Sequence, residues 1–365
     1  MIIAKQTIAY GAAAAIGAIA AFAAYSAPAA AQSEPFFRGK QVSLVIGYGP
    51  GGGYDTYARF LARFMGKHLP GKPAIVPRNM PGAGSLAAAN HIYNVVPKDG
   101  TVIGTVSQNV ALMQVLGQKG IQFDAAKFNW IGRITDADAV IGVWHTSPAK
   151  TIEDVRKHPT PIAVGSGLSG SVLYVTFLNE LTGMKFEPIA GYGSGPAMLA
   201  MERGEIEGNS SLLWSALKAK NPDWVRDNKV RILVQITLDK IPDLLEVPRL
   251  VDLAKNDDDR RMMATVTATN VIGRSILAPP GVPSERVKVL RAAFDATVHD
   301  PDFLAQAKKS RLDVNAMSGD KLAKLVADST ELPAPLVERM KQMASIKVRK
   351  VEKSGKSEKK KKEKN

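Results

Sequence analysis

Short apolar runs alternate with longer amphipathic ones from residue 42 onward. The run 42–48, "VSLVIGY", is apolar and predicts a buried strand. The stretch 54–69 carries apolar side chains at helical spacing and is closed by a Pro-Gly pair, so it predicts a helix. "AIVPRN", "GSLAAANHIYNVV" and "GTVIGTVS" then read as strand, helix and strand. Because parallel strands need a crossover connection, this rhythm predicts a mostly parallel sheet with helices on its faces.

A second series of the same kind begins near residue 139. Its expected strands are "AVIGVWH", "PIAVGSG", "KFEPIAGY", "EIEGNS" and "VRILVQIT", and its expected helices are "TIEDVRKH", "SVLYVTFLNEL" and "GPAMLAMERG". An apolar segment, "SILAPPGVP", and three helix-like stretches between 284 and 343 follow, which we expect to return to the first lobe. Two connections between α/β lobes form a hinge with a cleft. We therefore predict an α/β fold with lobe 1 at 32–135 and 252–345 and lobe 2 at 136–251.

The two ends of the 365-residue chain differ in composition from its body. Lys5, an apolar run and the A-x-A pattern of Ala29 and Ala31 predict a cleaved signal peptide at 1–31 and hence export to the periplasm, although a retained membrane anchor would show a similar run. The segment 347–365 holds ten Lys or Arg and three Glu, a net charge of +7. Of the total net charge of +14, about +6 therefore belongs to the body once Lys5 is also removed with the leader. We expect 346–365 to be a disordered basic tail.

Loops that carry Gly or Ser follow five of the predicted strands. They are 49–55 "GPGGGYD", 81–85 "PGAGS", 105–109 "TVSQN", 165–171 "GSGLSGS" and 191–196 "GYGSGP". Loops at the carboxyl ends of parallel strands line the ligand crevice, and the helix starts that follow them expose unpaired N–H groups. Five such loops from both halves favour an anion site over ordinary turns.

Catalytic and cofactor chemistry finds little support. Gly47, Gly49 and Gly52 fit a dinucleotide loop, but the acidic residue expected about 20 positions later is replaced by "PRN". The five His residues form no i, i+4 pair, no Cys exists, and no Ser lies in G-x-S-x-G. The sequence therefore predicts no cofactor, no metal and no catalytic residue.

The segments that carry the binding argument also carry a resemblance. "GYGPGGGYDTYARFLARFM", "RNMPGAGSLAAANHI" and "VPKDGTVIGTV" resemble successive motifs of the Bug-type solute receptors of tripartite tricarboxylate transporters, and the similarity continues through "LAPPGVP". The resemblance implies a type II periplasmic-binding-protein fold whose cleft closes on a small carboxylate. It also implies delivery to membrane permease subunits by a monomer, with no nucleic-acid partner.

The resemblance also implies a set of site residues. Main-chain N–H groups of the first two loops would hold one ligand carboxylate, and a more variable set would meet the far end of the ligand. Three departures weaken the transfer: Met80 replaces an Arg, Ser85 replaces a Gly, and "PIAGYGSG" replaces V-P-Y-K-G-x-G. The implied residues are Gly51, Gly52, Gly53, Tyr54, Asp55, Gly82, Ala83, Gly84 and Ser85 for the carboxylate, and Ser107, Ser166, Ser169, Gly193 and Asn209 for the far end.

Three alternatives stay open from the sequence. Asp55 at a helix start organises its loop more readily than it contacts an anionic ligand, which it would repel. An exported hydrolase or transferase could use the same cleft on a carboxylate. A sensory module could pass the closed state to a signalling protein instead of a permease.

Overall fold

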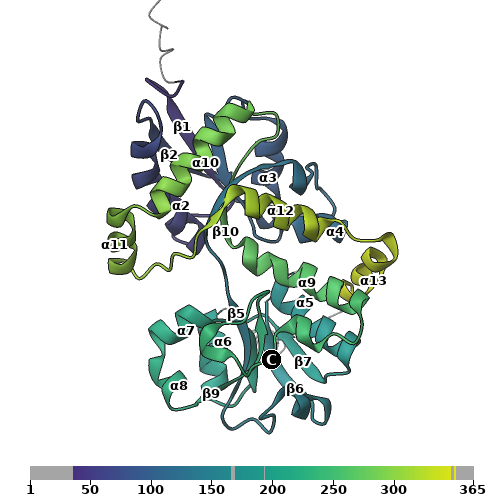
Figure 1. Cartoon of the computed structure of the whole chain (residues 1–365). Helices are drawn as coiled ribbons and strands as arrows, with labels where there is room; N and C mark the ends of the chain where they lie inside the picture. Colours follow the sequence, from purple (N-terminus) through teal and green to yellow (C-terminus); the bar gives the residue numbers. More distant parts are fainter. Residues whose placement is uncertain (1–35, 166–168, 193, 347–348, 351–365) are drawn as a thin grey trace, which may run out of the picture.

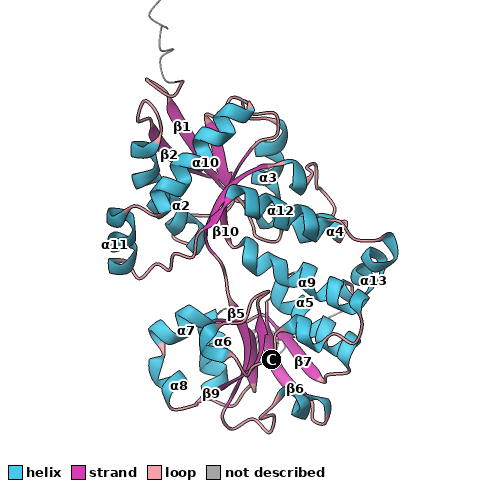
Figure 2. Cartoon of the chain, in the orientation of Figure 1, coloured by secondary structure: helices cyan, strands magenta, loops and turns pink. Residues whose placement is uncertain are grey.

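The chain folds around two six-stranded sheets, one in each lobe. The computed structural model describes residues 36–165, 169–192, 194–346 and 349–350, and the predicted leader lies outside them. Helices flank both sheets, and the lobes are stacked end to end in Figures 1 and 2. The first sheet has the order β11 (Met317–Ser318), β4 (Asn129–Thr135), β10 (Arg274–Ala278), β3 (Val102–Thr105), β1 (Gln41–Ile46), β2 (Ala74–Asn79). The second has the order β12 (Arg349–Lys350), β7 (Phe186–Ala190), β6 (Thr160–Val164), β8 (Gly208–Leu213), β5 (Ala139–Trp144), β9 (Val230–Ile236).

Each sheet has a parallel part and an antiparallel part. In the first lobe β1 lies between β2 and β3 and is parallel to both, whereas β10 is antiparallel to β3 and β4. In the second lobe β6 is parallel to β7 and β8, whereas β5 is antiparallel to β8 and β9. The prediction of parallel strands is thus confirmed for the strands that carry the glycine loops, and the remaining strands make each sheet mixed.

The helices cover the sheets and connect the lobes. Apolar faces of α2, α10 and α11 pack on one side of the first sheet, while α9 and α13 place Met262, Val266 and Met340 in the core of the second lobe. The helices are α2 (Gly53–Met65), α3 (Leu86–Asn94), α4 (Val110–Val115), α5 (Gly170–Phe177), α6 (Ser194–Glu202), α7 (Trp214–Lys220), α8 (Pro222–Arg226), α9 (Asp257–Ile272), α10 (Ser284–Val298), α11 (Pro301–Lys309), α12 (Gly319–Thr330) and α13 (Ala334–Ala344).

Two connections between the lobes run side by side. β4 leads into β5 through residues 136–138, and α9 leads into β10 at Gly273. Gly273 has φ +52°, and a side chain there would collide with the carbonyl oxygen of Thr135, so this crossing needs glycine. A third crossing joins α12 to α13, which the sequence analysis did not anticipate.

The residue boundaries given above for the lobes stay a prediction. The structure adds that α9 and α13, both in the segment predicted for lobe 1, contribute buried side chains to the core around β5 and β6. Within the predicted tail, Arg349–Lys350 pair with β7 as the short strand β12. No helix in the described part of the chain has the length and apolar character that a membrane span requires.

Candidate functional site

The three first-lobe loops 49–55, 81–85 and 105–109 meet at the carboxyl edge of β1, β2 and β3. The Ser107 N–H donates to Ser85 Oγ at 3.1 Å, which joins the second and third loops. The Gln108 N–H donates to the Tyr54 hydroxyl at 2.9 Å, which joins the third loop to the first. Side chains at the ends of neighbouring parallel strands are expected to converge in this way.

Asp55 organises the first loop from within. Its Oδ2 accepts the Gly51 N–H at 2.9 Å, and its Oδ1 accepts Arg59 Nε and Asn79 Nδ2, each at 2.8 Å. Asn79 also donates to the carbonyl oxygen of Tyr48 at 2.9 Å. Burial raises the pKa of the Asp55 carboxyl, but these donors outweigh it and hold the pKa below its usual range. Asp55 is 4% exposed, so it serves as an internal anion that fixes the loop.

The backbone of the glycine loops, by contrast, faces outward. Gly51, Gly52 and Gly53 are exposed. Gly52 is the N-cap residue directly before α2, and no side chain caps this helix start by a hydrogen bond. The second loop is likewise exposed from Gly82 to Gly84, and Gly84 has φ +65°. Because the first N–H groups of a helix have no partner inside it, the start of α2 presents unpaired donors at this edge.

The second-lobe residues of the predicted site are described in part. Asn209 is buried and, with Gly165, Ser171 and Tyr192, lines a cavity of about 160 Å³ at the ends of β6 and β8. Ser169 precedes α5, and its hydroxyl lies 3.1 Å from that of Ser171. Ser166 and Gly193 lie outside the described residues. The far-end set therefore stays a prediction.

A polar network that the sequence analysis missed connects the lobes beside these loops. Gln108 Nε2 donates to Asn270 Oδ1 at 3.1 Å, and the Tyr174 hydroxyl of α5 donates to the same oxygen at 2.9 Å. Asn270 Nδ2 donates to the carbonyl oxygen of Ile236 in β9 at 3.0 Å. Asn270, near the end of α9, thus ties a first-lobe loop to two elements of the second lobe.

Tyr54 and Arg274 complete the first-lobe side. The Tyr54 ring stacks on Tyr48 with 4.4 Å between centroids, and the Arg274 guanidinium lies 4.6 Å from the Tyr54 ring centre. Burial raises the pKa of Tyr54 to about 12 although the Arg274 charge opposes the shift, so the hydroxyl stays protonated at neutral pH. Arg274 lies over 200 residues from Tyr54 in the sequence. No local sequence pattern therefore connects it to the first loop.

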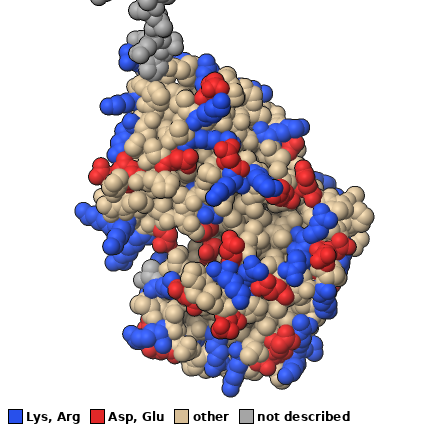
Figure 3. Space-filling view, in the orientation of Figure 1, with Lys and Arg blue, Asp and Glu red and all other residues tan. Residues whose placement is uncertain are grey.

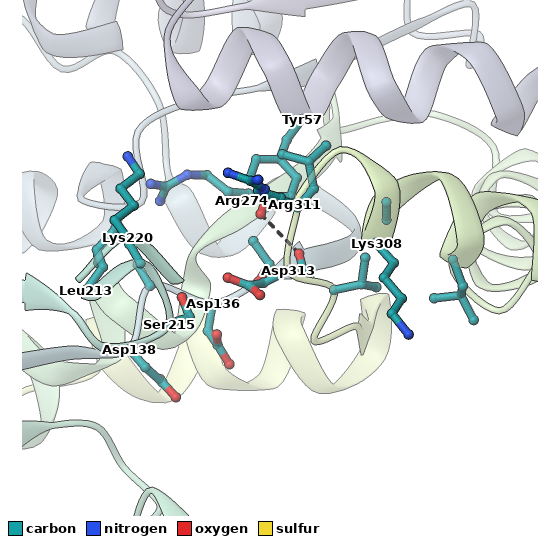
Figure 4. Close-up of a pocket in the computed structure, with 17 residues that line it drawn as sticks. Tyr57, Asp136, Asp138, Leu213, Ser215, Lys220, Arg274, Lys308, Arg311 and Asp313 are labelled. Carbon is teal, nitrogen blue, oxygen red and sulfur yellow. Dashed lines mark hydrogen bonds between the residues drawn. The ribbon is translucent and has the colours of Figure 1, made fainter. Parts of the chain in front are cut away.

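A cavity of about 570 Å³ lies between the lobes next to Arg274. Its walls come from the first connection, 135–138, from α7 in the second lobe and from residues 304–314 in the first. Figure 4 shows Tyr57 and Arg274 together on one side, with Asp136 and Asp138 across from them. None of the predicted site residues lines this cavity.

Charge on the molecule is mixed outside this region. Figure 3 shows basic and acidic side chains interspersed over one face of both lobes. Among the described residues, no three His, Cys, Asp or Glu side chains gather into a group that could hold a metal ion.

The chain is similar in sequence and in fold to known proteins. Residues 57–341 match the tripartite tricarboxylate transporter family receptor, TctC. A UPF0065 protein of Cupriavidus necator is 26% identical over 324 residues, with 86% of this chain and 91% of that protein covered.

Two solved structures share the fold. A TctC solute-binding protein from Polaromonas superposes with a TM-score of 0.63 at 21% identity, covering 83% of this chain and 97% of the other. A protein of R. palustris solved with adipate superposes with a TM-score of 0.56 at 19% identity, covering 85% and 98%. The two-lobed α/β fold of periplasmic solute-binding proteins is thereby confirmed, and the chain belongs to the TctC family of solute-binding receptors.

Proposed function

We propose that this chain is a periplasmic solute receptor that captures a small organic carboxylate between its lobes and delivers it to permease subunits of a tripartite tricarboxylate-type transporter. The observation that carries the proposal is the meeting of two exposed glycine loops, at 51–53 and 82–84, with the loop 105–109 beside an interlobe network. Family membership supports the transport role, and the adipate found with a protein of the same fold supports a carboxylate ligand.

The strength of binding follows from the donors at this edge. The ligand carboxylate is held by backbone N–H groups of Gly52 to Asp55 and Gly82 to Gly84, since the Gly51 N–H already donates to Asp55 and the Ser85 N–H to the Gly82 carbonyl oxygen. Ser107, Ser169 and Asn209 meet its far end. Each charge-assisted hydrogen bond contributes about 1.5 to 3 kcal/mol before ordering costs. Several such bonds supply the roughly 8 kcal/mol of a micromolar complex.

The protein acts in this proposal by binding alone. The residues around the loops are committed to holding them: the Asp55 carboxylate and the Ser85 and Ser107 hydroxyls all pair within the protein. Among the described site residues, no nucleophilic side chain lies in contact with a base. This favours a receptor over an exported hydrolase. We propose that it works as a monomer without a cofactor.

Thermal unfolding in the presence of mono-, di- and tricarboxylates tests the proposal. A ligand at one hundred times its Kd stabilises the folded state by about 2.7 kcal/mol, which raises the melting temperature by several degrees. Failure of every member of the panel to shift the melting temperature would contradict the proposal.

Gly52→Val locates the binding site. Gly52 has φ −80° and ψ 170°, an extended backbone that Val adopts readily, and a Cβ there has no neighbour closer than 4.0 Å. The variant should fold but lose binding at least tenfold, because its side chain covers the start of α2. Gly84 is a poorer choice, since its φ of +65° would strain any other residue.

Gly49→Val is the matched control in the same loop. Nothing lies within 4 Å of a Cβ at this position, and Gly49 lies outside the proposed contacts. Calorimetry should give it a Kd within threefold of wild type. Equal loss in both variants would show that the loop is merely sensitive to bulk.

A further inference from the structure

Arg274 occupies the point where the lobes join. It is the first residue of β10, directly after Gly273, and its Cα pairs with that of Thr135 at the end of β4. Its side chain is half-buried and lines the interlobe cavity of about 570 Å³ (Figure 4). The side chain is anchored by a hydrogen bond from Nη1 to Gln108 Oε1 in the loop after β3.

The guanidinium is incompletely satisfied. Of its five N–H donors, Nη1 donates to Gln108 Oε1 at 2.7 Å, whereas the Nε group is buried and has no hydrogen-bond partner. Within the described part of the chain no carboxylate pairs with Arg274, although Arg59 and Arg133 each pair with an Asp. A buried cationic donor without a partner is costly, and an anion would remove the cost.

The edge of the Arg274 guanidinium that carries Nε and Nη2 lies at the start of α2. Nε and Nη2 are each 3.9 Å from the position that a Cβ on Gly53 would take. Because Gly53 has no side chain, this residue does not come between Nε or Nη2 and a ligand at the start of α2. The ring of Tyr54 stands under the guanidinium and holds its plane in place.

The acidic residues of the cavity are committed elsewhere or lie apart. Asp136 is 3.5 Å from Arg133 and accepts a hydrogen bond from Asn315. Burial, with Asp136 nearby, raises the pKa of Asp138 to about 6, and Arg133 is the cation that opposes this shift. Neither carboxylate supplies the partner that Arg274 lacks, and Asp313, the third acidic residue that lines the cavity, is not among the described ion pairs of Arg274 either.

We propose that Arg274 binds the ligand directly, so that one carboxylate is held jointly by its guanidinium and by the unpaired N–H groups at the start of α2. This inference rests on the proposed function and adds a charged side chain to a site otherwise made of backbone donors. The ligand class it selects is an anion with a planar pair of oxygens, which a guanidinium meets with two parallel hydrogen bonds.

Calorimetry with adipate, malate and citrate tests the inference on wild type, Arg274→Gln, Arg274→Lys and Arg63→Gln. Arg63 is an exposed residue of α2, so its variant carries the same change of charge away from the site. For the tightest ligand of wild type we expect Arg274→Gln to weaken binding about 10- to 100-fold. Arg274→Lys should recover part of the loss because it restores the charge, and Arg63→Gln should stay within threefold.

The outcomes separate this inference from the proposed function. If wild type binds none of the three acids, the proposed function fails and takes this inference with it. If wild type binds and Arg274→Gln binds equally well, the proposed function stands and Arg274 is not a ligand contact. If Lys and Gln variants lose binding equally and both unfold at lower temperature without ligand, Arg274 only positions Tyr54 and Gln108, and the inference is overturned.

Discussion

The Asp55 side chain illustrates how a carboxylate can organise the loop of a proposed anion site. Its two oxygens accept one backbone and two side-chain donors, and these bonds close the loop between Gly51 and Arg59. The carboxylate is thereby neutralised by Arg59 at 2.8 Å and turned away from solvent. The sequence analysis favoured this organising role for Asp55 over ligand contact, and the contacts are of the kind it expected.

Asp55→Asn should destabilise the protein and change its acid sensitivity. Losing a charged acceptor leaves buried donors poorly paired, which costs about 1 to 3 kcal/mol. The folded-state pKa of Asp55 is lowered, so its contribution is present above the unfolded value near 4 and is lost as pH falls through the folded value. The variant should therefore be less stable than wild type at pH 7, with the difference shrinking below about pH 4.

Urea unfolding at pH 7 and at acid pH measures this difference. Asp258→Asn is the control, because Asp258 is an exposed carboxylate in the first turn of α9. Its change should stay within about 0.5 kcal/mol at both pH values. A constant deficit of Asp55→Asn from pH 7 down to pH 3 would contradict the assigned network.

At the level of elements, the sequence predicted best where periodicity is strong. β2 matches the predicted strand 74–79, α2 begins one residue before its predicted stretch 54–69 and ends four residues before its end, and α3 lies within its predicted stretch. α9 was missed because nearly all of its inner residues are buried and its Thr-rich stretch 265–269 gives no amphipathic stripe. The predicted helix 151–158 is a 3-10 segment, Ile152–Arg156, and four helices rather than three follow residue 284.

The candidate site was predictable only where it is local in sequence. Gly51 to Asp55 and Gly82 to Ser85 stand out by composition, and the structure brings these loops together. Arg274 and Asn270 reach the same place through a helix and a strand of the returning chain, so no spacing connects them to the loops.

The α9 contact between lobes can be measured as a coupling. Asn270→Ala leaves the Tyr174 hydroxyl and the Gln108 amide without their acceptor and should cost about 2 to 3 kcal/mol, while Tyr174→Phe should cost about 1. The double variant should cost about as much as Asn270→Ala alone, because the shared hydrogen bond of 2.9 Å is lost only once.

Chemical denaturation of the four proteins gives the cycle. Asn94→Ala serves as a comparison, since its exposed amide donates to two carbonyl oxygens within the first lobe. We expect that change to cost under about 1 kcal/mol. Strict additivity of the Tyr174 and Asn270 changes would mean that the two side chains do not bind each other.

On the scale of the whole molecule, two lobes meet along a seam of polar contacts and a cavity. The paired connections at 136–138 and Gly273 are where we expect the lobes to rotate about one another. The third crossing places α13 beside α9 in the core of the second lobe. A ligand that contacts both lobes would favour the closed arrangement, because it adds interactions only there. Binding and closure are then one equilibrium.

Titration calorimetry with a carboxylate and with its neutral amide tests this account most directly. Both compounds have the same shape, but only the carboxylate carries the charge that we propose the loop N–H groups and Arg274 receive. Wild-type protein should bind the tightest acid of the panel with a Kd near 1 μM, about 8 kcal/mol, and bind its amide at least a hundredfold more weakly. Equal affinity for acid and amide would contradict the assignment of these loops as an anion site.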